Sequence, residues 1–177
     1  MPTGKLAVWW VVASEIVIFG GLLASYIMHR LAHDDWSEQA AHTNTWLGAF
    51  NTLVLLTSSL SAVLAHKAAT EGNGPKAAKL LWCTILGAVT FVAVKAFEWT
   101  TEIQAGYTIT SSTFWSFYYT AAGLHAAHVI AGGIIMAIVA IDAAKYKELH
   151  RVELIGIYWH FVDLVWIFLF PLLYIAK

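Results

Sequence analysis

The sequence predicts an all-α membrane protein, a polytopic bundle of five transmembrane helices. Of its 177 residues, 59% are hydrophobic and only 12% are charged, about half the charged fraction of an ordinary soluble domain. The apolar residues gather in five runs, and each run holds the roughly 20 residues that a helix needs to cross a hydrocarbon core of about 30 Å. The runs are too long and too continuously apolar for the alternating strands of a membrane barrel.

Polar stretches divide the chain into five predicted helices within one transmembrane domain that covers residues 1–177. These helices lie at about 5–30, 44–66, 79–101, 113–141 and 154–176. A Gly-Asn-Gly-Pro turn at 72–75 separates the second helix from the third. The fourth helix has a choice of N-caps among Thr110, Ser111, Ser112 and Thr113. No loop is long enough to form a soluble catalytic domain, so any chemistry lies inside the bundle or at its faces.

Basic residues gather on one side of the predicted bundle. Seven lie on the side of the N-terminus and of the second and fourth loops, whereas Arg30 and Lys177 lie opposite. The positive-inside rule therefore predicts a cytoplasmic N-terminus and an external C-terminus. The seven are Lys5, Lys67, Lys76, Lys79, Lys145, Lys147 and Arg151.

Net charge and cysteine content exclude two further features. With a net charge of −1 and no basic run, the chain gives no sign of a nucleic-acid partner. The single cysteine, Cys83, excludes an internal disulfide.

Three groups of residues have a structural interpretation. The acidic first loop, Leu31–Thr43, is expected to be solvated surface, although its histidines suggest a metal site as the alternative. Small residues in the first and fourth helices are expected to form helix–helix seams; they include Gly20, Gly21, Gly132 and Gly133. Seven tryptophans fit an aromatic belt at the membrane interfaces, namely Trp9, Trp10, Trp36, Trp46, Trp99, Trp115 and Trp159.

Polar side chains within the predicted helices are the candidate functional residues. A polar or ionisable group at membrane depth is tolerated where it faces other protein or water. The set comprises Glu15, Asn51, Glu98, His125, His128, His160 and Asp163. Such a set forms either a satisfied polar core or a proton wire. The core is favoured, because no continuous series of acids reaches both surfaces.

Lys95 and Glu98 stand three residues apart, on one helix face that also carries Glu102, and are expected to form an internal ion pair. The alternative is that Glu98 reaches across to a histidine.

A bis-histidine haem would need axial ligands on two helices, such as His160 with His125 or His128. A di-iron site would need paired Glu-x-x-His motifs, which the sequence lacks. Neither catalytic nor metal-ligating residues are therefore assigned. A small b-type cytochrome and a proton-conducting transporter remain as alternatives.

The motifs of all five helices together resemble subunit III of the haem–copper oxidases. The last helix carries Tyr158-Trp-His-Phe-Val-Asp163-Leu-Val-Trp166. Four further motifs agree in order: Ser14-Glu15, Asn51-Thr52 followed by His66, Phe97-Glu98-Trp99, and Gly123-Leu-His125-Ala-Ala-His128-Val-Ile-Ala-Gly132. The resemblance covers essentially the whole chain.

The resemblance implies an accessory subunit of a bacterial terminal oxidase that reduces O2 to water and translocates protons. The subunit is not expected to be catalytic alone and would lie in the cytoplasmic (inner) membrane. Haem and copper would belong to subunit I, and this chain would stabilise subunit I, bind phospholipid and support proton uptake. Further implied partners are subunits II and IV and supercomplex members. The family's buried carboxylate corresponds to Glu15, and its internal polar contacts to Glu98, His125, His128, His160 and Asp163.

The sequence departs from the family pattern at two points. In seven-helix members, two further helices upstream form a lipid-filled cleft with the other five, whereas five helices are predicted for this sequence. Five-helix versions are similar to subunits of bacterial caa-type and bo-type oxidases and to accessory proteins of nitric oxide reductases, which remain an alternative. Lys95 stands where the family usually has a neutral polar residue, which favours its pairing with Glu98.

Overall fold

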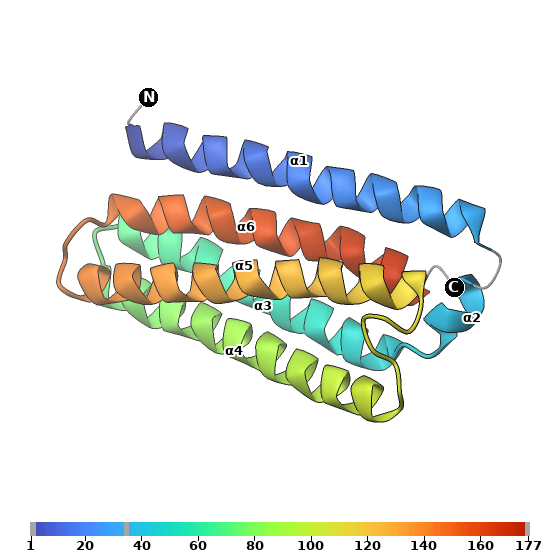
Figure 1. Ribbon diagram of the computed structural model, residues 1–177. Coiled ribbons are helices and arrows are strands. Elements are labelled where there is room, and N and C mark those ends of the chain that lie inside the picture. The colour runs from blue at the N-terminus through green and yellow to red at the C-terminus, as the bar shows by residue number, and fades with distance from the viewer. Residues whose placement is uncertain (1–2, 34–35, 176–177) are drawn as a thin grey trace.

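The structure, a computed structural model, describes residues 3–33 and 36–175 and consists of helices joined by short connections (Figure 1). The elements are α1 (Thr3–Ala32), α2 (Trp36–Ala41), α3 (Thr45–Thr70), α4 (Gly74–Gln104), α5 (Thr113–Ala144), α6 (His150–Phe170) and the π-helical turn η1 (Pro171–Ile175). Within these described ranges, five helices are long and apolar enough to cross a membrane, when α6 and η1 are taken as one. The predicted fold class, an all-α bundle of five transmembrane helices, is therefore confirmed.

Side-chain caps set where three of the long helices begin. The Asn44 side chain accepts hydrogen bonds from two backbone N–H groups at the start of α3, and Ser112 accepts one from Trp115 at the start of α5. Asn73 caps α4, which therefore begins before the predicted boundary near Lys79. The caps take up N–H groups that the first turn of a helix leaves unpaired. At the chain's end, Ala176 of the predicted fifth helix lies outside the described residues.

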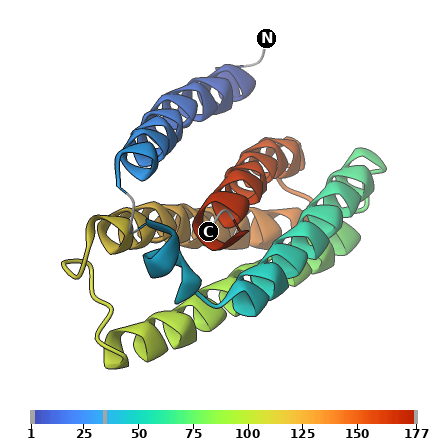
Figure 2. The same ribbon diagram turned by 90° about the vertical axis from the view of Figure 1, so that its right-hand side faces the viewer.

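Helices α3, α4, α5 and α6 form a closed four-helix ring, in which α6 packs against both α5 and α3. Helix α1 lies outside this ring, next to α5 and α6, and stands apart in both views (Figures 1 and 2). Only 11% of the most apolar window of α1 is buried, against 50% for the last helix. Most of the α1 surface is therefore available to lipid or to another protein.

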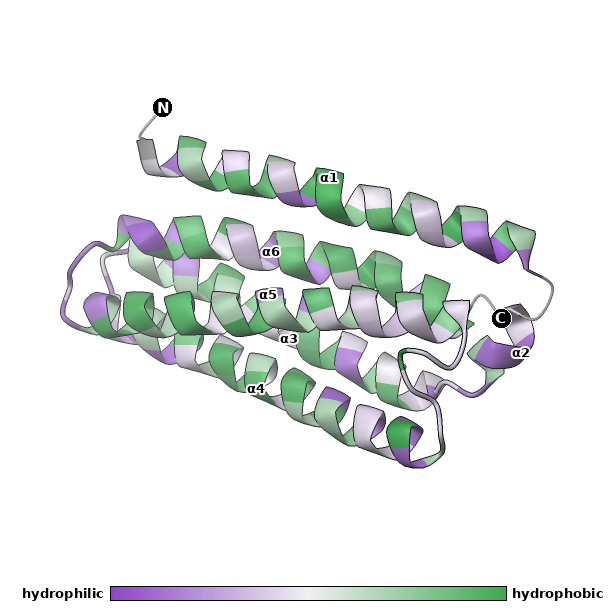
Figure 3. Ribbon diagram, viewed as in Figure 1, coloured by the Kyte–Doolittle hydropathy of each residue, from purple (hydrophilic) through white to green (hydrophobic). Residues whose placement is uncertain are grey.

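Hydrophobic residues make up most of each long helix, and hydrophilic residues are most frequent at helix ends and connections (Figure 3). The start of α1, the α3–α4 connection and the α5–α6 connection lie at the same end of the bundle (Figure 1). The basic residues Lys5, Lys76 and Lys145 consequently share one end, whereas Arg30 lies at the other. Lys177 lies outside the described residues.

Two expectations about the surface were wrong only in part, since His33, Glu38 and His42 of the first loop are exposed as expected. The first loop contains α2, whose Trp36 is buried and donates a hydrogen bond from Nε1 to the Tyr26 hydroxyl at 3.2 Å; Asp34 and Asp35 lie outside the described residues. Trp115 and Trp159 are also fully buried, so they belong to the core and not to an interfacial belt. Trp10 and Trp46 are exposed, as a belt requires. Hydropathy gives every tryptophan the same value, so it does not distinguish a buried ring from an exposed one. Contacts with neighbouring residues decide which rings are buried.

The expectation that small residues in the first and fourth predicted helices form helix–helix seams was wrong in part. A Cβ added at Gly20 or Gly21 would meet nothing within 4 Å, so these glycines contact no other helix among the described residues. A Cβ at Gly132 would lie 2.9 Å from the Tyr158 ring and 3.2 Å from the Trp159 ring. The close approach at Gly132 therefore joins α5 to α6.

Candidate functional site

Glu15 on α1 and His128 on α5 meet in the gap between α1 and the four-helix ring. His128 Nε2 lies 3.0 Å from Glu15 Oε2, and both side chains are largely buried. The other ring nitrogen, Nδ1, lies 2.8 Å from the carbonyl oxygen of Leu124. A carbonyl oxygen only accepts, so Nδ1 carries a hydrogen and Nε2 faces the carboxyl group. A hydrogen bond between Nε2 and the carboxyl group therefore requires a hydrogen on one of the two.

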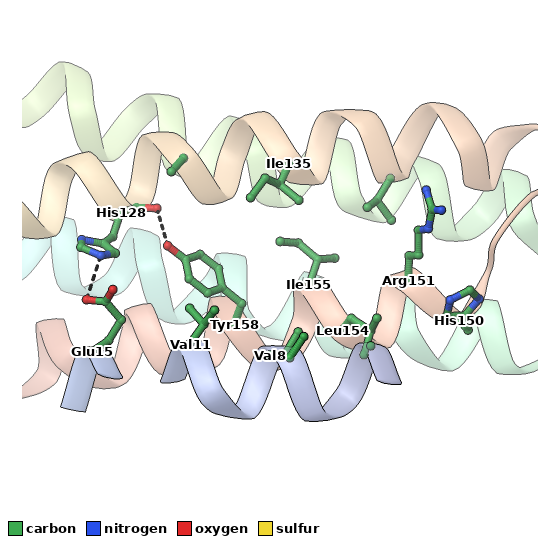
Figure 4. A pocket seen from close by; sticks show the side chains of 14 residues that line it. Val8, Val11, Glu15, His128, Ile135, His150, Arg151, Leu154, Ile155 and Tyr158 are labelled. Atoms are coloured by element: carbon green, nitrogen blue, oxygen red, sulfur yellow. Dashed lines mark hydrogen bonds and ion pairs between the residues drawn. The ribbon is translucent and has the colours of Figure 1, made fainter. Parts of the chain in front are cut away.

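A pocket of about 640 Å³ leads to this pair between α1, α5 and α6. Its walls are mainly aliphatic and include Val8, Val11, Ile135 and Ile155, as Figure 4 shows. Glu15 and His128 lie at one end, and His150 and Arg151 at the other (Figure 4). The pocket therefore combines an apolar interior with two polar ends, one of which carries Arg151 beside Asp142 and Glu148.

Polar contacts near both ends hold α1 against the ring. At one end, Lys5 Nζ lies 2.6 Å from Glu153 Oε1 on α6. At the opposite end, the Tyr26 hydroxyl donates a 2.6 Å hydrogen bond to the carbonyl oxygen of Leu172 in η1. Together with the Glu15 contact, these interactions position α1 at three levels along its length.

A second polar cluster lies inside the four-helix ring, around Lys95. Its Nζ is 2.9 Å from Glu98 Oε2, and both side chains are almost completely buried. The ammonium also donates hydrogen bonds to the hydroxyl of Tyr118 on α5, at 3.3 Å, and to the hydroxyl of Tyr174 in η1. Three donors thus meet three acceptors, which is the condition for burying an ammonium group.

The cluster extends to Glu102, one turn further along α4. Tyr118 donates a 3.0 Å hydrogen bond to Glu102 Oε1, and its hydroxyl lies 3.1 Å from that of Tyr174. Sequence reasoning placed Glu102 on the face of Lys95 but left Tyr118 and Tyr174 out of the site. A hydroxyl within an apolar run needs a partner when buried, and that signal could have identified both tyrosines.

His160 and Asp163 face α3. His160 Nδ1 lies 2.6 Å from the Ser59 hydroxyl. Asp163 is buried, and neither of its carboxyl oxygens has a hydrogen-bond partner in the described part of the chain. The structure thus places His160 next to Ser59, which was not among the candidate residues identified from the sequence.

Asn51 and His125 line the centre of the ring. Asn51 donates a hydrogen bond of 3.4 Å to the carbonyl oxygen of Phe91. The His125 ring stacks on Trp166, with centroids 5.1 Å apart, and meets Phe91 edge-on at 5.4 Å. Within residues 3–33 and 36–175, neither ring nitrogen of His125 has a hydrogen-bond partner.

The seven candidate residues therefore occupy separate places in the bundle. Glu15 pairs with His128 outside the four-helix ring, Glu98 with Lys95 inside it, and His160 with Ser59 across α3 and α6. Over the described ranges, no three or more His, Cys, Asp or Glu side chains come together as a metal site. The arrangement can hold protons and charge and can position helices.

Comparison with known proteins gives a consistent result. The family model for cytochrome c oxidase subunit III matches residues 4–177. A cytochrome c oxidase subunit 3 from Corynebacterium diphtheriae is 32% identical over 172 residues, which cover 93% of this chain and 84% of the relative. A protein of the same name from Thermostichus vulcanus is 31% identical, with 92% and 82% covered.

A third relative is larger. The heme-copper oxidase subunit I+III of Aeropyrum pernix is 28% identical over 188 aligned positions, which cover 99% of this chain and 23% of that protein.

Proposed function

Because this chain belongs to the cytochrome c oxidase subunit III family, we propose that it is the accessory subunit III of a bacterial terminal oxidase. The complex reduces O2 to water and translocates protons, while haem and copper lie in subunit I. The observation that carries the proposal is the family match over residues 4–177, which includes every transmembrane helix. In this function the chain stabilises subunit I, binds phospholipid and supports proton uptake.

Subunit I is the proposed direct partner, and subunits II and IV and supercomplex members join the same assembly. The relative named subunit I+III supports this pairing, because one polypeptide there carries both names. The outer surface of α1 supports it too, since most of that helix is uncovered by its own chain. A partner helix would cover the apolar surface that the four-helix ring leaves free.

The pocket beside α1 is the proposed phospholipid site. Its aliphatic walls suit an acyl chain, and Arg151 at one end, half-exposed beside Asp142 and Glu148, offers a guanidinium group to an anionic headgroup. The position of Arg151 agrees with the orientation already expected. Lys5 and Lys145 share the end of Arg151, which the positive-inside rule assigns to the cytoplasm of a bacterial inner membrane.

Proton uptake is proposed to involve Glu15. Its carboxyl group meets His128 at one end of a pocket whose other end, at His150 and Arg151, lies on the proposed cytoplasmic side. A carboxyl–imidazole pair of this kind can accept a proton and pass it on without a metal or a haem.

The test is isolation of the assembly in mild detergent, with and without this chain. Subunit I should copurify with the chain. The assembly that lacks the chain should keep its haem absorption but lose O2-reducing activity sooner during repeated turnover. Loss of a haem band without loss of subunit I would contradict the proposal. So would an intact complex that consumes nitric oxide and not O2, which would favour a nitric oxide reductase accessory protein.

A further inference from the structure

Glu102 lies in the last turn of α4, close to three tyrosines. Its side chain is almost fully buried. Tyr118 Oη donates to Glu102 Oε1 at 3.0 Å, and Tyr119 Oη lies 3.5 Å from Oε2. The third tyrosine, Tyr107, follows α4 in the loop and presents its backbone carbonyl to Tyr119.

The hydrogen count at Tyr119 indicates the protonation state of Glu102. A phenol has one hydrogen, and the hydroxyl of Tyr119 lies 2.8 Å from the carbonyl oxygen of Tyr107, which can only accept. Tyr119 therefore donates to Tyr107 and presents a lone pair toward Glu102 Oε2. Two oxygens without a hydrogen between them repel, so this contact is favourable when Oε2 carries a proton.

The hydrogen bonds of Tyr118 agree with that assignment. Lys95 donates to the hydroxyls of Tyr118 and Tyr174 and to Glu98, which uses all three ammonium hydrogens. Tyr118 accepts from Lys95 and donates its single hydrogen to Glu102 Oε1. The Tyr174 hydroxyl, 3.1 Å away, is then the donor in its contact with Tyr118. In this arrangement Oε1 is the carbonyl oxygen of a carboxylic acid and Oε2 its hydroxyl.

Charge balance supports the neutral acid independently. The cluster contains one cation and two carboxyl groups, and Glu98 already neutralises Lys95. An ionised Glu102 would add an uncompensated charge in a low-dielectric interior. It would also stand at the C-terminal end of a helix, where the helix dipole disfavours a negative charge. The titratable and charged groups of the surrounding elements are Lys95 and Glu98 on α4, Tyr118 and Tyr119 on α5, Tyr174 in η1, Tyr107 in the loop, and His42, which stacks on Tyr107.

We propose that Glu102 is a proton-binding site that exchanges with water at this end of the bundle. On release, the proton moves from Oε2 to a water molecule and forms hydronium, which leaves a carboxylate. The hydroxyl of Tyr119 then turns from the carbonyl of Tyr107 to Oε2, so the carboxylate receives two phenolic hydrogen bonds. Proton release at Glu102 therefore frees the loop that carries Tyr107. This site lies near the opposite end of the bundle from Arg151 and does not depend on the function proposed for Glu15.

Infrared difference spectroscopy of the purified complex tests the site. The wild type should show a carboxylic-acid C=O band at neutral pH that shifts in D2O and disappears on alkaline titration. The nearly isosteric Glu102→Gln variant should lack that band. Glu38→Gln is the matched control, because Glu38 is an exposed acid on α2, and it should retain the band. A spectrum of Glu102→Gln identical to that of the wild type would overturn the proposal.

A second variant keeps the carboxyl group in place. Tyr119→Phe removes the hydroxyl that faces Oε2, so the band of Glu102 should shift in frequency. The backbone amides of the loop that carries Tyr107 should also exchange faster, because their contact with Tyr119 is lost. An unshifted band in Tyr119→Phe would show that Oε2 carries no proton toward this hydroxyl and would equally overturn the proposal.

Discussion

His128 Nε2 on α5 lies 3.0 Å from Glu15 Oε2 on α1, and the same imidazole is anchored through Nδ1 to the Leu124 carbonyl 2.8 Å away. The anchor fixes which nitrogen meets the carboxyl group, and the carboxyl group in turn connects α1 to the four-helix ring. One contact thus holds α1 in position and, in the proposed function, also shares a proton. These two roles can be separated by substitution.

Glu15→Ala should destabilise the association of α1 with the ring by about 1–3 kcal/mol, because it leaves a largely buried ring nitrogen without a partner. Glu15→Gln should lose much less, since its amide can donate to Nε2. Thermal unfolding of the purified complex measures both. Glu38→Ala, at an exposed position on α2, is the control and should match the wild type. Equal losses in the alanine and glutamine variants would argue against the contact.

Replacing Lys95 by methionine should destabilise the protein by about 3–5 kcal/mol, because Glu98 is left as a buried carboxylate without its cation. Combining Lys95→Met with Glu98→Gln should recover much of that loss, since no uncompensated charge remains. A double-mutant cycle in chemical denaturation measures the coupling. Additive losses would mean that the two side chains contribute independently.

Gly132→Ala should force α5 and α6 apart and cost about 1–3 kcal/mol, the usual penalty for overpacking. The added methyl group would meet the rings of Tyr158 and Trp159. Gly20→Ala provides the comparison, because nothing lies within 4 Å of its Cβ and alanine favours the helix. The measurement is the melting temperature of each variant. A destabilising Gly20→Ala would reveal a packed neighbour there within the assembly.

His160→Ala should leave the haem spectrum of the complex unchanged. His160 contacts Ser59 on α3, whereas His128 contacts Glu15 on α1, so the two imidazoles are directed to different neighbours. The chain expressed alone should likewise show no Soret band. A Soret band that disappears in His160→Ala would instead establish a bis-histidine cytochrome.

Cysteine accessibility should verify the orientation in the membrane. In a Cys83→Ser background, a cysteine at Lys147 should react with an impermeant reagent only after the cells are opened. A cysteine at Ser111 should react in intact cells, because its loop lies at the opposite end of the bundle. The reverse pattern would place the N-terminus outside the cytoplasm and would contradict the positive-inside assignment.

Several contacts between different helices could not be predicted from the sequence pattern. The spacing of Lys95 and Glu98 showed that the two share a helix face, but not that hydroxyls from α5 and η1 close the cluster. Trp36 stands near a helix end, as an interfacial residue would, yet α2 folds back and buries it against Tyr26. Helical periodicity relates residues within one helix, whereas each of these contacts joins different elements.

The sequence alone determined that the chain crosses a membrane with five helices, and roughly where each begins. Length and hydropathy suffice for that, because every backbone polar group in lipid must be satisfied within its own helix. The tertiary structure decided which polar side chains meet. It pairs Glu15 with His128 outside the ring and places Tyr118 between Lys95 and Glu102 inside it. Partners across helices depend on rotation and depth, which packing sets and hydropathy does not encode.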